Sequence, residues 1–176
     1  MAYFDYDIAK RCYKGESFML QIIDCLNEYD SYHLLRGSTP NMKRPISISN
    51  KEYMRWLSVC DGGLLFSTTL LSTSEYDGQL DLPFSTLQDY NSPMQKKIYS
   101  LPEGYTVIAI LNYGDPICVS DFDSKIYLWD TQNNIFSTIW DSFADFLADE
   151  YNTAAQMIEE DVLKPVPMKI AEEQDG

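Results

Sequence analysis

The stretch from Tyr105 to Leu147 reads YTVIAILNYGDPICVSDFDSKIYLWDTQNNIFSTIWDSFADFL and decides the fold of this chain. It contains four short apolar runs, at 105–110, 117–119, 126–129 and 135–139, separated by segments rich in Gly, Pro, Asn and Asp. Because the strands of antiparallel hairpins are short, apolar and closed by such turn residues, these runs predict an antiparallel meander.

A covering helix is predicted directly after the meander. Phe143, Phe146, Leu147 and Tyr151 recur at helical spacing, and the preceding Asp141-Ser142 offers side-chain oxygens that can cap the first turn. One face of this helix is apolar, so we expect it to lie on the sheet.

The residues before the meander predict further helices and two strands. An amphipathic helix is expected at 16–29, and Ser49 and Glu52 have the spacing of a capping box that begins a second helix. Gly62-Gly63 ends this helix, and we expect one of the two glycines to supply a positive φ. Short strands at 64–66 and 69–72 and a weak helix at 85–99, interrupted at Pro93, complete the set, with loops at 30–47 and 74–81.

The order of these elements favours a single α+β domain. Strands that follow one another without alternating helices predict a central antiparallel sheet flanked by helices. With 176 residues the chain has the usual size of one domain, which we place at 1–161. The acidic tail at 162–176 gains little by folding unless it docks on the body.

The charge of the chain limits its partners. A formal net charge of −14 and a pI near 4.2 repel the phosphates of nucleic acids, which proteins grip with Lys and Arg. Direct nucleic-acid binding is therefore not expected, whereas a basic protein partner would be attracted and its association accelerated. The structural alternative is that the acidic surface serves solubility alone.

Targeting signals and cysteine chemistry favour a cytoplasmic protein. The N-terminus lacks the basic and apolar regions of a signal peptide, and no apolar run is long enough to span a membrane. Cys12, Cys25, Cys60 and Cys118 are scattered without the spacing of a zinc site. They are interpreted as small apolar side chains in a reducing compartment.

No catalytic motif is evident. Asp121 and Asp123 form a D-x-D pair, but the glycine and distal glutamate of a calcium loop are missing. His33, the only histidine, lies beside a polar loop without a nucleophile motif, and no phosphate-binding glycine loop is present. We therefore expect a protein that is not an enzyme and that holds no metal or cofactor.

One set of residues stands in a characteristic order and spacing: Tyr53, Trp56 and Leu57 before Asp61-Gly62-Gly63; 107–110; Tyr113-Gly114-Asp115; 117–119; Asp121; 126–130; and Trp140-Asp141-Ser142-Phe143 before Phe146-Leu147. In these residues the chain resembles the SUKH superfamily over roughly Ser47 to Tyr151. This superfamily, of Smi/Knr type, groups fungal cell-wall-assembly regulators with bacterial immunity proteins against toxins. The departures are Asp61, where the superfamily more often has Asn, and the N-terminal segment, which does not align with it.

The resemblance implies an α+β fold and binding rather than catalysis. It implies an immunity protein that neutralises a cognate toxin, often a nuclease, or alternatively a regulatory or scaffolding protein of the same fold that acts on a host enzyme. The expected partner is another protein with a basic domain. Monomer and homodimer both remain open.

Acidic side chains in the predicted turns and loops are the candidate partner-binding residues. They are Asp61, Asp81, Asp115, Asp121, Asp123 and Asp130, to which Asp141 is added as a neighbour. The alternative is local: Asp115, Asp121 and Asp123 also suit turns, and Asp141 also suits a helix cap. The candidate structural residues are Trp56, Gly62, Gly63, Trp129, Trp140 and Phe143, because indole and phenyl rings dominate cores and glycines suit helix ends.

Overall fold

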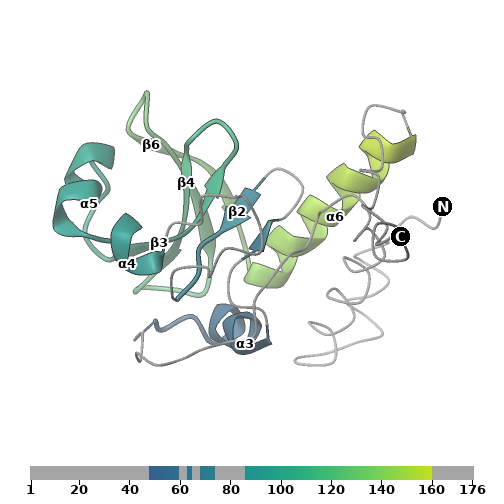
Figure 1. The fold of residues 1–176 in the computed structure, drawn as a ribbon, viewed down its shortest axis with the longest axis horizontal. Coiled ribbons are helices and arrows are strands. Elements are labelled where there is room, and N and C mark those ends of the chain that lie inside the picture. Colours follow the sequence, from purple (N-terminus) through teal and green to yellow (C-terminus); the bar gives the residue numbers. More distant parts are fainter. Residues whose placement is uncertain (1–47, 60–62, 65–67, 74–85, 160–176) are drawn as a thin grey trace, which may run out of the picture.

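The computed structural model describes residues 48–59, 63–64, 68–73 and 86–159 (Figure 1). Its elements are α3 (Lys51–Val59), β1 (Gly63–Leu64), β2 (Thr68–Leu70), α4 (Leu87–Tyr90), α5 (Pro93–Tyr99), β3 (Tyr105–Leu111), β4 (Pro116–Ser120), β5 (Ile126–Asp130), β6 (Ile135–Trp140) and α6 (Phe143–Glu159).

The sheet is the meander that the sequence predicts, extended by two strands. Its six strands lie in the order β1-β2-β3-β4-β5-β6, and every neighbouring pair is antiparallel. The two additional strands pair with each other, Gly63 opposite Leu70, and β2 then pairs with β3. The α+β fold with a central antiparallel sheet is confirmed.

Helices cover both faces of this sheet. Figure 1 shows α4 and α5 on one side and α6 on the other, with α3 below. On the α6 side the ring of Trp140 in β6 lies 5.2 Å from that of Phe146. On the opposite side the indole Nε1 of Trp129 donates to the carbonyl of Tyr99 at the end of α5, at 2.8 Å.

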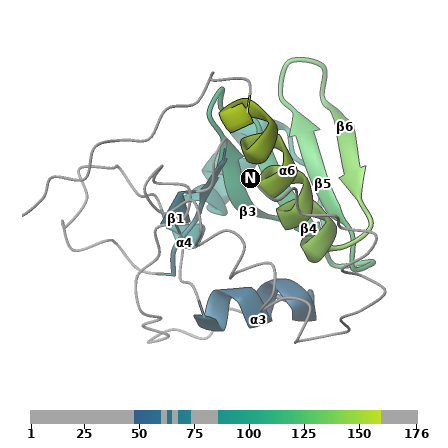
Figure 2. The same cartoon turned by 90° about the vertical axis from the view of Figure 1, so that its right-hand side faces the viewer.

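Part of the core lies where α3 and α6 meet the sheet, and Figure 2 shows these two helices beside the strands. Trp56 and Tyr53 of α3 are 1% exposed, and their rings meet Phe143 of α6 edge to face at 5.8 and 5.3 Å. Burying each such side chain contributes about 1.5–3 kcal/mol. The two helices and the sheet therefore stabilise one another.

The candidate structural residues have different environments. Trp56, Trp129 and Phe143 are buried, whereas Trp140 is half-buried and its Nε1 donates to Asp149 at 3.1 Å. Gly63 lies in β1 rather than at a helix end, and Gly62 lies outside the described residues.

The predicted capping box at α3 is wrong. Asn50 is the residue before the helix, and its Oδ1 accepts from the amide of Tyr53 at 2.9 Å, while Ser49 lies one residue farther out. Glu52 is therefore not at the third helical position that a capping box needs. Its carboxylate instead accepts a hydrogen bond from the backbone amide of Ala144 in the first turn of α6.

The cap of α6 is Ser142, whose Oγ accepts from the amide of Asp145 at 3.0 Å. Both Asp141 and Ser142 were candidates for this role from the sequence. Asp141 lies one residue before the cap and is exposed. Together with Glu52, Ser142 satisfies two amides that every helix start leaves without partners.

The interruption of the weak helix at Pro93 is confirmed, since α4 ends at Tyr90 and α5 begins with Pro93 in its first turn. The connecting residue Asn91 fixes this pair of helices to the sheet. Its side-chain Oδ1 accepts from the backbone amide of Val107 at 2.7 Å, and its Nδ2 donates to the Val107 carbonyl at 2.8 Å.

Several expectations lie outside the described residues. They are the helix at 16–29, the loops at 30–47 and 74–81, the domain limit at 161 and the tail at 162–176.

Candidate partner-binding site

The candidate aspartates do not form one patch. Asp61 and Asp81 lie outside the described residues. Asp115 and Asp130 lie at the β3–β4 and β5–β6 turns, whereas Asp121 and Asp123 lie in the β4–β5 turn at the opposite end of the sheet. Successive turns of a meander alternate between the two ends, and a five-residue strand such as β4 separates those ends by roughly 16 Å.

Asp115 holds two neighbouring turns together. Its Oδ1 accepts from the hydroxyl and the amide of Thr131, at 2.7 and 3.2 Å, and thereby joins the β3–β4 turn to the β5–β6 turn. This carboxylate is committed to the fold, as the alternative interpretation of the sequence allowed.

Asp130 is committed to its own turn. Its carboxylate accepts from the side-chain and backbone amides of Asn133, at 2.8 and 3.0 Å, and from the amide of Gln132 at 2.9 Å. These hydrogen bonds, led by that from the Asn133 side chain, lower the pKa of Asp130 below its usual value. The carboxylate therefore carries its charge at neutral pH while it shapes the turn.

The β4–β5 turn presents two carboxylates on either side of an exposed ring. Asp123 accepts from the amide of Lys125 at 2.9 Å and from the hydroxyl of Tyr127 at 2.6 Å. Burial, and next the hydrogen bond to Asp123, raise the pKa of Tyr127 to about 12. Asp121 is exposed, and its carboxylate makes no hydrogen bond within the described part of the chain, so it is available to a partner.

Phe122 is the aromatic side chain between these carboxylates. It is 74% exposed, yet its ring lies over Gly104 and meets Tyr105 edge to face at 6.1 Å. Gly104 has a φ of 85°, and a Cβ there would come within 2.5 Å of the Phe122 ring. Because the ring lies this close to Gly104, a residue with a Cβ at that position would displace it.

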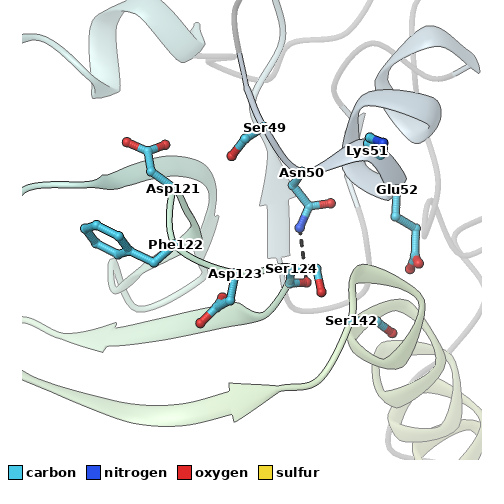
Figure 3. A pocket seen from close by; sticks show the side chains of 9 residues that line it. All are labelled: Ser49, Asn50, Lys51, Glu52, Asp121, Phe122, Asp123, Ser124 and Ser142. Atoms are coloured by element: carbon cyan, nitrogen blue, oxygen red, sulfur yellow. Dashed lines mark hydrogen bonds between the residues drawn. The ribbon is translucent and has the colours of Figure 1, made fainter.

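A cavity of about 440 Å³ lies beside this turn (Figure 3). The start of α3 supplies one wall, the β4–β5 turn a second, and Ser142 at the start of α6 a third. Asn50 ties the walls together, because its Nδ2 donates to the carbonyl of Ser124 at 3.2 Å. The lining residues are Ser49, Asn50, Lys51, Glu52, Asp121, Phe122, Asp123, Ser124 and Ser142.

The chemistry of this cavity suits a cationic side chain of a partner. Its lining includes three acidic residues, Glu52, Asp121 and Asp123, against one basic residue, Lys51. The carboxylates of Glu52 and Asp123 also accept hydrogen bonds within the fold. An exposed ring beside carboxylates is also suited to a guanidinium group, which is attracted to both. Sequence analysis named both aspartates but missed Glu52, Asn50 and Phe122, because their positions depend on the packing of α3 against the turn.

Other chemistry finds little support in the described residues. Among them no three His, Cys, Asp or Glu side chains lie close enough to hold a metal ion. Burial raises the pKa of the Cys118 thiol to about 12, so this thiol is not a nucleophile at neutral pH. Within the same described ranges, no helix combines the length and the apolar character needed to cross a bilayer.

Comparison with known proteins identifies a family. The model of the SMI1 / KNR4 family (SUKH-1) matches residues 50–149, which include α3, the whole sheet and the start of α6. No curated protein and no solved structure matches the chain.

Proposed function

The chain belongs to the SMI1 / KNR4 family (SUKH-1), and from this we propose that it is a cytoplasmic immunity protein that neutralises a cognate toxin by direct binding. Proteins of this family are in general non-catalytic immunity or regulatory proteins. The observation that carries the proposal is the family match, which spans the cavity and the β4–β5 turn.

The β4–β5 turn is the proposed contact with the toxin. It presents Asp121, Asp123 and the exposed ring of Phe122 from a six-stranded sheet. Aromatic side chains are common anchors of protein interfaces, and surrounding charges select the partner. A basic toxin domain, such as that of a nuclease, would meet carboxylates where it normally meets phosphates.

The net charge of −14 acts at longer range. It draws a basic partner toward the surface before contact, so association should slow as salt screens the field. The rate therefore depends on ionic strength, whereas the lifetime of the complex depends on Phe122 and the cavity.

A pull-down from the native cell, at low and moderate salt, tests the proposal. We expect one basic protein, whose toxicity in a test strain is suppressed when this chain is expressed with it. Recovery of a host enzyme without toxicity would assign the chain to the regulatory branch of the family instead.

A matched pair of charge reversals tests the contact surface. Asp121→Lys should weaken the affinity for the recovered protein by about 2- to 30-fold, because an exposed ion pair contributes roughly 0.2–1 kcal/mol and reversal adds a repulsion of similar size. Asp89→Lys makes the same change at an exposed site on α4 and should have no such effect. Equal affinities of the two variants would exclude the β4–β5 turn as the contact.

A further inference from the structure

Strand β6 forms the long edge of the sheet. It is the last strand in the order and has six residues, Ile135–Trp140, whereas β1 at the other edge has two. Within the described part of the chain no strand pairs with its outer side. The backbone groups on that side can therefore accept another strand.

The side chains of β6 do not protect this edge. None is charged and none is proline, although charges and prolines are the usual devices that prevent edge pairing. Ile135 and Ile139 are 55% and 52% exposed, near the two ends of the strand. A register shift opposite Leu128 and Trp129 marks a bulge in β6, which increases the local twist and works against the stacking of many strands on this edge.

The charges around β6 define what the edge can bind. Residues 126–159 contain no Lys or Arg. Asp130 lies at the turn before β6, and Asp141 follows Trp140, whose indole also contacts Asp149. The edge is thus neutral in its middle and negative at both ends, over about 20 Å for six residues.

We propose that β6 is a strand-addition site for an extended segment of a partner protein, with about six mainly apolar or β-branched residues and with Lys or Arg at both ends. The inference rests on the proposed function, since the segment belongs to the bound partner. Backbone hydrogen bonds give such a contact its affinity, and the terminal charges give it selectivity.

A second copy of this chain suits the edge poorly. In a symmetric antiparallel pair the turn end of one β6 would meet the Trp140 end of the other. Asp130 of one copy would then approach Asp141 of its mate, and each copy adds a net charge of −14. Charge complementarity therefore selects a basic partner.

The test uses the full chain and the synthetic peptide KKITVTIKK. Bound peptide should slow amide hydrogen exchange in 135–140 at least about tenfold, and the affinity should fall as salt rises from 50 to 300 mM. The peptide EEITVTIEE, and KKITPTIKK, whose proline removes a backbone donor, should not protect these amides.

Matched variants locate the contact. Ile139→Lys should weaken binding of KKITVTIKK at least about tenfold, because it adds a cation beside a basic peptide. Ile98→Lys makes the same change at a 67% exposed site on α5 and should leave binding unchanged. Ile135→Lys repeats the test at the other end of β6, and circular dichroism confirms that each variant is folded.

Three outcomes would overturn the proposal. The first is that the peptide does not slow amide exchange in 135–140, and the second is equal loss of peptide binding in the Ile98 and Ile139 variants. The third is slower exchange that appears with rising protein concentration alone, which would show a second copy as the occupant. The proposed function fails separately. If the toxin of the native cell binds while 135–140 remain unprotected, immunity stands and strand addition does not. If the peptide pairs with β6 but no toxin is found, strand addition stands alone.

Discussion

Replacement of Asn91 by alanine should weaken the attachment of α4 and α5 to the sheet. The Asn91 side chain makes three hydrogen bonds, two with the backbone of Val107 and one with the carbonyl of Leu87 at 2.8 Å. Val107 is fully buried, and the register of β3 against β4 shifts just after it. In the variant, its amide and carbonyl would lose these partners.

The magnitude follows from these groups. An unpaired buried donor or acceptor costs about 1–3 kcal/mol, and the half-buried position of residue 91 allows water to replace part of the loss. We expect Asn91→Ala to lower the free energy of unfolding by about 2–4 kcal/mol. The Tm should fall by roughly 4–16 °C in a chain of this size.

Urea unfolding and amide exchange of Val107 provide the assay. Asn91→Asp is the informative companion, because its carboxylate can accept from the Val107 amide but cannot donate to the Val107 carbonyl. Exchange of the Val107 amide should accelerate in Asn91→Ala and less in Asn91→Asp, which keeps the acceptor. A loss below about 0.5 kcal/mol in Asn91→Ala, with unchanged exchange at Val107, would refute the role of this side chain.

Three further predictions concern the site and its supports. Gly104→Ala should destabilise the chain by about 1–2 kcal/mol through its positive φ and should also displace the ring of Phe122. Gly114→Ala, at a φ of 101° with open space around it, is the control and should show the backbone strain alone. Equal loss of partner binding in both variants would exclude a role for the Phe122 ring. Glu52→Ala should speed amide hydrogen exchange at Ala144. Glu52→Gln keeps an acceptor oxygen and should speed this exchange less. Unchanged exchange at Ala144 in both variants would argue against the contact between α3 and α6. The pKa of Tyr127 is raised to about 12, so the fold favours its neutral form. The stability that this preference confers should be complete below pH 10 and lost as the pH rises toward 12. Tyr127→Phe should remove one late step from the phenolate absorbance titration at 295 nm, and an unchanged titration would contradict the buried hydrogen bond to Asp123.

The sheet was predictable because its signals are local. Each strand from 105 to 140 carries its own apolar run and is closed by its own turn residues, so no distant contact is needed to recognise it. The helix after Ser142 is recognisable for the same reason. Its apolar stripe has the helical period and a capping residue precedes it.

The helix starts were less accessible because they depend on tertiary contacts. Ser49 and Glu52 have the spacing of a capping box, but Asn50 is also a good cap, and the choice between them moves the helix start by one residue. Glu52 then reaches Ala144, which is 92 residues away in sequence. No local pattern reports such a partner.

The candidate site was predictable in part. The turn composition identified Asp115, Asp121, Asp123 and Asp130 as residues near the sheet ends, and the alternation of turns in a meander already separates them into two pairs. Which carboxylates are committed to the fold depends on neighbours such as Thr131 and Tyr127. The cavity and the position of the Phe122 ring depend on α3 and Gly104, which approach the turn only in the folded chain.

The central claim is that a basic partner protein binds at the β4–β5 turn. Amide exchange of the full chain with and without the protein recovered from the native cell tests it most directly. Bound partner should slow exchange at 121–125 and at the start of α3 and leave exchange in α4 and α5 unchanged. Protection confined to α4 and α5, with 121–125 exchanging as in the free chain, would contradict it.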